Sequence, residues 1–402
     1  MRIGRTLPPA AAPLSVQEVL SGVAALFAGK RAVERFEAEL RQHYAVPHAF
    51  LLSSGQAALA VILTALKRDR PGRDEVLIPA YTCYSVPAAV VRAGLRVRPC
   101  DIDPRTLDFD WERLEEALQG GRVLCAVATH LFGVPADVGR LKAAAARYGV
   151  AVVEDAAQAM GGEVNGSKVG TLGDVALFSL GRGKGLCTVS GGIILAGSGP
   201  VGSAIENIVA TLPREGWGDA LKALCYALAL VVLVRPSLFW LPRALPFLGL
   251  GETVFNPGFA LKRLGAFQAG LARGWREKLL RLREARLRHA TFLERAGVAA
   301  AVPLHGAVPD LVRFPVLVGD PAQRARLIEM SAEQGLGVAA VYPEAVTRIP
   351  ELQGALAGGA APQAEQVARR IVSLPVHPLV TQRDLERIAA LFRAEQGEQK
   401  GR

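Results

Sequence analysis

Residues 152–185 read VVEDAAQAMGGEVNGSKVGTLGDVALFSLGRGKG and contain the ends of two strand-like runs, each followed by an ionisable side chain. The first run, residues 150–153, is apolar and β-branched, which is typical of a buried strand. Asp155 follows it at the carboxyl end. The second run, residues 175–179, is followed five residues later by Lys184, which lies between two glycines. Open α/β sheets bind ligands at the carboxyl ends of their strands, so both side chains are candidates for a binding site.

Strands and helices alternate outward from this stretch in both directions. Further strands are expected at residues 49–52, 75–78, 95–100, 123–129 and 193–196. Helices are expected at residues 31–44, 57–68, 110–120, 137–148 and 276–296. This alternation indicates βαβ units, and it predicts an α/β fold with a mostly parallel sheet flanked by helices. Pro99 argues against the strand at 95–100, because proline cannot donate to a sheet ladder.

Changes in residue composition and in the pattern of expected strands and helices divide the chain into three parts. Residues 14–212 carry the alternating pattern and are expected to form a large ligand-binding domain. Residues 259–402 contain a long arginine-rich helix and then mixed short elements, which predicts a smaller C-terminal α+β domain that includes the linking helix. Residues 213–258, between these two parts, form an apolar insert that contains several prolines.

The insert contains twelve consecutive apolar residues, ALCYALALVVLV, at positions 223–234. As a helix this run spans about 18 Å, which is short of the roughly 30 Å of a bilayer core. The prolines within residues 236–246 would break any longer helix. Two interpretations remain open. The insert is either a buried helix hairpin or dimer contact, or a segment that lies in a membrane interface with Trp217 and Trp240 at its edges. The second interpretation places these basic residues near lipid headgroups: Arg214, Lys222, Arg235, Arg243, Lys262 and Arg263.

The composition excludes long disorder, because half of the 402 residues are hydrophobic. The formal net charge is +10, but the basic residues are spread along the chain without blocks or interleaved aromatic residues. This distribution favours a solvated basic face over a nucleic-acid site. Such a face also suits anionic substrates or anionic lipid.

The cysteines and the N-terminus bear on the compartment. The five cysteines form no CxxC pair and no zinc spacing, so no metal site is expected. An odd, scattered set of cysteines suits a reducing compartment. The first fifteen residues, MRIGRTLPPAAAPLS, contain no continuous apolar run, so no signal peptide is expected. These observations predict a cytoplasmic protein. The membrane-interface interpretation of residues 213–258 would add a peripheral contact with the inner face of the membrane.

Four short motifs carry the candidate chemistry. The turn Ser53–Gln56 joins a strand to a helix, whose free N–H groups and dipole attract an anion. Asp155 ends one strand, Lys184 lies in a glycine-rich loop, and Gly191–Gly192 let the backbone pass close to that loop. Each motif alone is more often an ordinary cap or loop. Together, a phosphate cradle, an acid at a strand end and a lysine are the groups that pyridoxal phosphate (PLP) requires.

The order and wording of these motifs resemble the DegT/DnrJ/StrS-type nucleotide-sugar aminotransferases, a family of fold-type-I PLP enzymes. The resemblance rests on HAFLLSSGQAAL, RDEVLIPAYTCYSVPAAVVRAGLRVRPCDIDPRTLDFD, THLFGVPADV, residues 152–185, RLGAFQAGL and SLPVHPLV. It implies an aspartate-aminotransferase-like large domain. It also implies transfer of an amino group, from glutamate or a similar donor, to a keto-sugar nucleotide for surface polysaccharide or glycoconjugate synthesis. The family's homodimers share two active sites across the interface.

The resemblance assigns roles by position. Lys184 is implied to form the Schiff base and to act as acid and base, and Asp155 to face the pyridine nitrogen. Gln158 falls beside the ring, and Cys83 falls where a stacking aromatic is common, with Tyr84 adjacent. The residues implied to bind the phosphate are Ser54, Gly55, Gln56 and Ser179.

Several positions depart from the family pattern. The family usually has Thr at Gln56, Glu at Ser190 and a partner-subunit Asn at Leu261, and a His commonly follows Tyr342–Pro343, where this chain has Glu344. The departures keep two alternatives open. One is a cofactor-binding but catalytically altered regulatory or scaffold homologue associated with the membrane surface. The other is a protein whose function is membrane-surface interaction alone.

Overall fold

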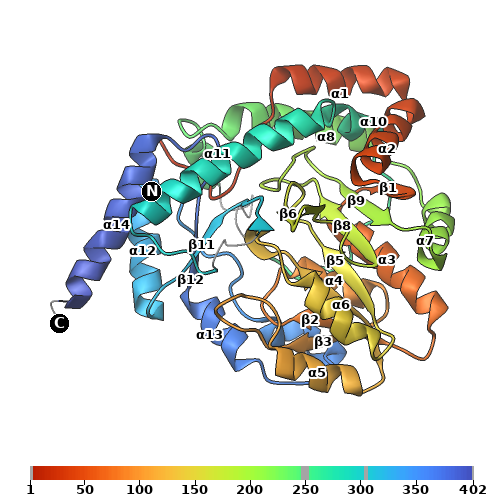
Figure 1. Cartoon of the computed structure of the whole chain (residues 1–402). Coiled ribbons are helices and arrows are strands. Elements are labelled where there is room, and N and C mark those ends of the chain that lie inside the picture. Colours follow the sequence, from red (N-terminus) through yellow and green to blue (C-terminus); the bar gives the residue numbers. More distant parts are fainter. Residues whose placement is uncertain (1–2, 246–252, 303–306, 401–402) are drawn as a thin grey trace.

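The computed structural model describes residues 3–245, 253–302 and 307–400. A seven-stranded sheet in the order β1-β9-β8-β5-β4-β2-β3 lies at its centre, with helices on both faces (Figure 1). The strands are β1 (His48–Leu52), β2 (Glu75–Pro79), β3 (Arg96–Cys100), β4 (Val123–Thr129), β5 (Ala151–Asp155), β8 (Val175–Ser179) and β9 (Gly192–Ala196). The neighbours from β8 to β3 pair in parallel, and β9 runs antiparallel to both β8 and β1. The mostly parallel, helix-flanked sheet is therefore confirmed.

The seven strands begin and end within two residues of the predicted runs. β3 is the edge strand of the sheet, next to β2, and its outer side is bridged to the chain at Val97 by Leu356, so Pro99 stands where no full ladder is required. The sequence pattern does not predict that β9 runs antiparallel to its neighbours. A short apolar strand has the same composition whether it lies parallel or antiparallel in the sheet.

Alternate residues of the strands enter different hydrophobic cores. Val153 of β5 lies in the core beneath α3 (Gly55–Asp69), whereas its neighbour Val152 lies in the core that includes side chains of α6 (Val138–Ala146). α4 (Ser85–Arg92) and α7 (Pro200–Thr211) accompany α3 on one face, and α5 (Trp111–Gln119) accompanies α6 on the other. This period of two fixes which strand residues point toward which layer.

The long helix α11 (Trp275–Arg295) leads from the large sheet to the C-terminal part. That part contains an antiparallel pair, β11 (Phe314–Leu317) and β12 (Ile371–Leu374), with α12 (Pro321–Gln334), α13 (Pro362–Arg370) and α14 (Gln382–Lys400). This combination of helices and an antiparallel strand pair agrees with the predicted α+β composition of the C-terminal part. The domain boundaries at 212 and 258 stay a prediction. A small sheet also joins β10 (Ala307–Val308), β6 (Glu163–Val164) and β7 (Ser167–Lys168). Short 3-10 turns lie at Leu131–Gly133, Val346–Arg348 and Pro350–Ala355.

The N-terminal helices and the insert pack together at one end of the molecule (Figure 1). α1 (Val16–Ala28) and α2 (Lys30–Tyr44) contact α10 (Ala266–Leu271), and α8 (Trp217–Leu233) contacts both α1 and α10. A short helix, α9 (Trp240–Arg243), follows α8.

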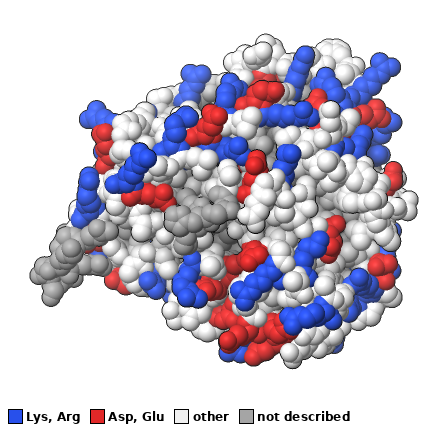
Figure 2. Space-filling model, in the orientation of Figure 1, with Lys and Arg blue, Asp and Glu red and all other residues white. Residues whose placement is uncertain are grey.

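The two interpretations of the insert, a buried hairpin or dimer contact and a membrane-interfacial segment, stay predictions. Only Ala223 and Ala227 of α8 are buried. Within the described ranges, no helix combines the length and the apolar character that crossing a bilayer requires. Basic and acidic side chains are interspersed on the face shown in Figure 2, without a single-sign block.

Candidate active site

The predicted site residues meet at the carboxyl ends of β5 and β8. Asp155 is the last residue of β5 and pairs with Leu177 of β8, two residues before Ser179 ends that strand. A bridge between Ser54 and Gly191 places the start of α3 against the chain that leaves the lysine loop. The sheet therefore brings four separated segments of the sequence to one edge.

The start of α3 has the features of an anion cradle. Ser54 is the N-cap, and its Oγ accepts from the N–H of Ala57 at 3.1 Å. The first N–H groups of a helix have no partner within the helix, so those of Gly55 and Gln56 point outward from its end. A Cβ on Gly55 would lie 3.0 Å from the Cβ and 3.3 Å from the Oγ of Ser179. Glycine at this position thus lets the Ser179 hydroxyl lie against the end of the helix.

Asp155 and Lys184 are close enough to interact electrostatically. Asp155 is buried and half-buried Lys184 lies in the loop after β8. Burial raises the pKa of the Asp155 carboxyl, and the N–H of Ala157 and the positive charge of Lys184 oppose that rise. The Ala157 N–H donates to Oδ1 of Asp155 at 3.1 Å. The acid and the lysine that the sequence singled out are therefore neighbours.

A fully buried ion pair holds the backbone of the lysine loop. Arg286 of α11 donates from Nη1 to Asp310 Oδ1 at 2.8 Å. The same guanidinium donates from Nη2 to the carbonyl of Lys184 at 2.9 Å and from Nη1 to that of Gly185 at 3.3 Å. A Cβ on Gly185 would lie 2.6 Å from Asp310 Oδ2, so a side chain there would displace the carboxylate. The sequence analysis missed this pair, because Arg286 is one of many arginines in its helix.

Gln158 meets a tyrosine from the C-terminal half of the chain. Its Nε2 donates to the hydroxyl of Tyr342 at 3.0 Å, and both residues are buried. The rings of Tyr342 and Tyr81 lie 5.6 Å apart in an edge-to-face arrangement. Burial raises the pKa of Tyr342, and the electrostatic influence of Cys83 and Tyr81 raises it further. Cys83 thus lies close to the Gln158 side of the site.

The neighbour of Asp155 has a structural role. Glu154 points to the other face of the sheet, where Oε1 lies 2.9 Å from Nε2 of His130. The Nδ1 of His130 accepts a hydrogen bond from the N–H of Ala136. The ring proton is therefore on Nε2, which donates a hydrogen bond to Glu154. Burial alone would raise the pKa of Glu154, but the hydrogen bonds from His130 and the N–H groups of Gly170 and Gly173 hold it below its usual value. One peptide unit thus separates a structural carboxylate from the candidate site carboxylate.

The donor set fits PLP. The helix start and the Ser179 hydroxyl suit a phosphate, Asp155 suits a protonated ring nitrogen, and Lys184 is the amine that an aldehyde requires. Around this edge, the buried hydroxyls of Tyr81, Thr82 and Thr129 have no hydrogen-bond partner in the described part of the chain. In the same described ranges, no group of three or more His, Cys, Asp or Glu residues could hold a metal ion.

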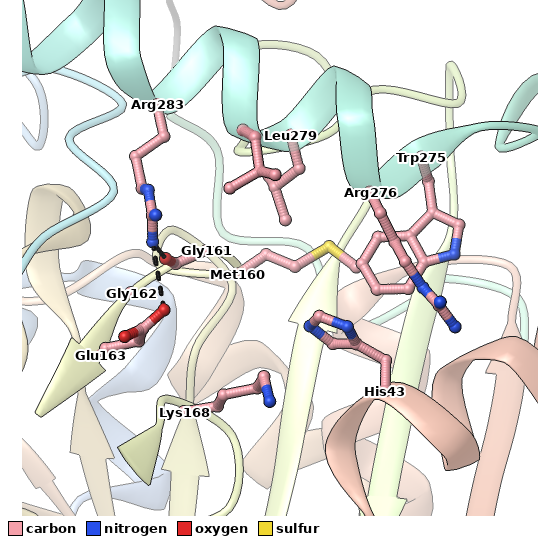
Figure 3. A pocket seen from close by; sticks show the side chains of 11 residues that line it. His43, Met160, Gly161, Gly162, Glu163, Lys168, Trp275, Arg276, Leu279 and Arg283 are labelled. Atoms are coloured by element: carbon pink, nitrogen blue, oxygen red, sulfur yellow. Dashed lines mark hydrogen bonds and ion pairs between the residues drawn. The ribbon is translucent and has the colours of Figure 1, made fainter. Parts of the chain in front are cut away.

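A separate hollow lies behind the lysine loop, between α2, α11 and the small sheet (Figure 3). Met160 and Leu279 line it, and they also lie 3.4 and 3.6 Å from the position of a Cβ on Gly185. These two side chains therefore separate the hollow from the loop that carries Lys184. His43 and Lys168 also line the hollow, and burial lowers the pKa of His43 to about 4, which leaves its ring neutral at pH 7.

The model of the DegT/DnrJ/EryC1/StrS aminotransferase family matches residues 13–393 of this chain. The chain belongs to this family. The family prediction made from the motifs is thus confirmed, and with it the expectation that the chain is related to PLP-dependent sugar aminotransferases.

Three curated relatives show the range of names within the family. A UDP-N-acetyl-3-dehydro-alpha-D-glucosamine 3-aminotransferase of Acidithiobacillus ferrooxidans is 28% identical over 89% of this chain and 86% of its own length. A pleiotropic regulatory protein of Geobacillus stearothermophilus is 28% identical over 90% of this chain and 89% of its own. An L-glutamine:2-deoxy-scyllo-inosose aminotransferase of Streptomyces kanamyceticus is 34% identical over 44% of this chain. That last match covers 41% of the relative, so the aligned stretch spans less than half of it.

Solved structures share the fold. The sugar aminotransferase CalS13 of Micromonospora echinospora has a TM-score of 0.77 and 22% identity, over 96% of this chain and 99% of that one. A Streptococcus pneumoniae protein in its PLP-form has a TM-score of 0.76 and 17% identity, over 98% and 99% of the two chains. At these identities the likeness establishes the fold, and it confirms the predicted fold-type-I class.

Proposed function

We propose that this chain is a PLP-dependent aminotransferase that moves an amino group, from glutamate or a similar donor, to a keto-sugar nucleotide. The carrying observation is the proximity of Lys184 to buried Asp155, beside the helix end formed by Ser54, Gly55 and Gln56. The names of the sugar-aminotransferase relatives support the substrate class. Synthesis of a surface polysaccharide or glycoconjugate is the proposed use of the product.

Each site residue has a proposed part in holding the cofactor. Lys184 holds the aldehyde through Nζ, and Asp155 faces the pyridine nitrogen. The phosphate lies against the start of α3 and the Ser179 hydroxyl. Gln158 lies beside the ring, fixed by its hydrogen bond to Tyr342. When bound, PLP supplies an electron sink that stabilises negative charge on the carbon next to the transferred amine.

The residues of the chain then manage the protons. Lys184, once its Nζ is free, is placed to move a proton between the substrate carbon and the cofactor. Asp155 keeps the ring nitrogen protonated, because a buried carboxylate stabilises a neighbouring cation strongly. The carbonyls of Lys184 and Gly185 are fixed by Arg286, which limits how far the lysine can move away between steps.

Cys83 gives the ring a smaller neighbour than an aromatic side chain would. Its Sγ lies 2.7 Å from the hydroxyl of Ser85, and Tyr84 instead reaches the carbonyl of Glu344. We therefore place Cys83 against the cofactor ring and Tyr84 toward the substrate side. A net charge of +10 suits an acceptor that carries a diphosphate.

We further propose a homodimer that works in the cytoplasm. The family resemblance supports the dimer, since active sites in the family are shared across the subunit interface. All five cysteines of the chain are free thiols, which agrees with a reducing compartment.

The test is the spectrum of the purified protein with PLP. We expect an absorption band at the edge of the visible range that shifts on addition of glutamate. The band should be lost in Lys184→Ala and kept in Lys168→Ala, a half-buried lysine on β7 that serves as the matched control. Uptake of no PLP by the wild-type protein, or an unchanged band in Lys184→Ala, would refute the proposal.

A second candidate function is that of a cofactor-binding regulatory or scaffold homologue. The relative named as a pleiotropic regulatory protein favours it, because that match extends over 90% of this chain. The departures at Gln56, Cys83 and Leu261 favour it as well. This candidate predicts the same absorption band but no spectral change with glutamate and no amine transfer to any keto-sugar nucleotide.

A further inference from the structure

Two helices of this protein carry stripes of exposed apolar side chains. On α1 the stripe consists of Val16, Leu20 and Phe27, which are 62%, 63% and 90% exposed. On α8 the stripe consists of Trp217, Leu221, Leu228 and Val232, which are 77%, 62%, 52% and 48% exposed. Spacings of four and seven residues place the members of each stripe on one face of their helix. Single exposed apolar residues are ordinary, but seven at helical spacing on two adjoining helices form a patch that requires a partner.

Both stripes face away from the body of the protein. α1 and α8 pack against each other and against α10. The buried side of α1 is close-packed, since a Cβ on Gly270 of α10 would lie 2.5 Å from the Cβ of Ala25. The buried side of α8 consists of Ala223 and Ala227, which join a core with Phe267 of α10. The opposite sides are the apolar stripes, and their large exposed fractions leave them open to solvent.

The acidic side chains of α1 and α8, and the neighbouring Glu215, have partners within the protein. Glu18 of α1 pairs with Lys278. Asp219 of α8 pairs with Lys262 at 2.9 Å. The third acid, Glu215, accepts from Nε2 of Gln268 at 2.6 Å. Glu18 and Glu215 are thus engaged inside the protein, while Asp219 also interacts electrostatically with Lys222 at the surface of the insert.

The basic side chains of the insert are directed outward. Lys222, Arg235 and Arg243 are exposed, and none forms an ion pair with a carboxylate of the described residues. Arg182 is exposed as well, and its guanidinium lies over the ring of Tyr226 at 5.3 Å. The apolar stripes are therefore accompanied by unneutralised positive charge.

We propose that the stripes of α1 and α8 dock this protein on an anionic lipid surface, with both helices lying in the plane of the interface. Apolar side chains accompanied by Lys and Arg are the pattern that binds the boundary between headgroups and acyl chains. Trp217, at the start of α8, is the side-chain type that prefers this depth. A second copy of the chain fits less well. A two-fold contact through the same face would bring Lys222, Arg235 and Arg243 of both copies together.

Vesicle sedimentation of the full chain tests the proposal. We expect binding to vesicles of phosphatidylcholine with phosphatidylglycerol, weaker binding to phosphatidylcholine alone, and loss of binding in high salt. Leu221→Glu/Leu228→Glu should weaken binding at least about 10-fold. Leu280→Glu, on α11 and 49% exposed, is the matched control and should bind like the wild type.

A second variant removes charge and leaves the apolar side chains in place. Lys222→Ala/Arg235→Ala/Arg243→Ala should weaken binding to the anionic vesicles by roughly 100-fold, since each basic residue near such a surface adds about fivefold. It should leave the weak binding to phosphatidylcholine unchanged. These exposed positions lack ion pairs, so this variant tests the proposal even if the glutamate variant folds poorly.

Three results would overturn the proposal. The first is a wild-type protein that sediments with neither vesicle, and the second is equal binding by wild type and both variants. The third is analytical ultracentrifugation in which Leu221→Glu/Leu228→Glu converts a dimer to a monomer while the wild type ignores vesicles. That third result would assign the surface to a second copy of the chain.

Discussion

The lysine loop and the surface of α1 and α8 differ in which kind of side chain they bury and which they expose. In the loop, buried polar groups are held within the chain, so that one arginine binds a carboxylate and two carbonyls at once, although Nε of Arg286 and Oδ2 of Asp310 have no hydrogen-bond partner among the described residues. On α1 and α8, apolar groups are exposed and are not covered by the described part of the chain. Each arrangement is costly in an isolated monomer, because buried charges lose hydration and exposed apolar groups order water. The difference indicates that the loop is built to hold a ligand in place and the helical surface to meet a second body.

The largest effect is expected from Asp310→Ala in the buried pair. The change leaves the guanidinium of Arg286 buried without its carboxylate, which typically costs about 3–5 kcal/mol of unfolding free energy. Urea denaturation measures the loss. The matched control is Glu284→Ala, which removes an exposed pair with Arg288 and should cost under about 1 kcal/mol. Equal losses of unfolding free energy in Asp310→Ala and Glu284→Ala would mean that the buried Arg286–Asp310 pair contributes no more than an exposed surface pair.

The next effect is on catalysis. Asp155→Asn keeps the shape of the side chain but removes the charge that we propose faces the cofactor nitrogen. We expect amine transfer to fall by about 10²–10³-fold, the usual effect of losing one buried electrostatic contact. Single-turnover kinetics with glutamate follow the change. Asp69→Asn, an exposed aspartate at the end of α3, is the control and should react like the wild type. A modest loss in Asp155→Asn, equal to that of the control, would mean that Asp155 does not face the ring.

A smaller effect is expected from pH, through a buried histidine of the same polar interior. His377 is fully buried, its Nε2 lies 2.8 Å from the carbonyl of Pro8, and burial lowers its pKa to about 4. Between pH 6.5 and about 4 the unfolded chain therefore binds a proton that the folded chain does not. By linkage, the folded state loses stability as pH falls through this window, by about 2 kcal/mol.

The control for this effect is His377→Gln, which cannot titrate. The slope of unfolding free energy against pH between 6.5 and 4 should be shallower in this variant. If both proteins have the same slope, His377 does not contribute to acid sensitivity.

The smallest effect is expected from Leu221→Ser in the apolar stripe of α8. Because Leu221 is 62% exposed, its loss should change the unfolding free energy by less than about 0.5 kcal/mol. Leu271→Ala, in the α10 core beneath the same helices, should cost about 2–5 kcal/mol. Thermal unfolding of both variants sharpens the comparison. A large loss in Leu221→Ser would mean that the stripe is part of the core and has no external partner.

Much of the fold could be predicted from local pattern. Buried strands such as 123–129 and 175–179 matched the structure at both ends, because a short β-branched run leaves the backbone few alternatives. Asp110, the first residue of the helix expected at 110–120, caps α5 by accepting from the N–H groups of Glu112 and Arg113. Helices of mixed composition were harder. The sequence analysis did not predict α1, whose exposed stripe obscures the usual division into an apolar and a polar face.

The candidate site could be predicted only where its residues are close in sequence. Asp155, Gln158, Ser179 and Lys184 follow one another within one stretch, so their meeting at the sheet edge follows from strand order. Asp310 comes from the C-terminal half and carries no local signature, and Tyr342 belongs to a Tyr-Pro pair that the resemblance aligned without any sign of its contact with Gln158. Tyr342 contacts Gln158, and Asp310 contacts Arg286. These residues are far apart in the sequence, so no helix or strand periodicity links them.

By itself, the sequence determined the alternation of strands and helices, the family, which acid ends one strand and which lysine lies in the loop after another. These follow from local steric preference and from the period of apolar residues. Only the tertiary structure decided that Arg286 supports Lys184 from 102 positions away. It also decided that α1 and α8 expose their apolar sides together. Both outcomes depend on which distant segments pack side by side, and that is set by the summed fit of the whole core.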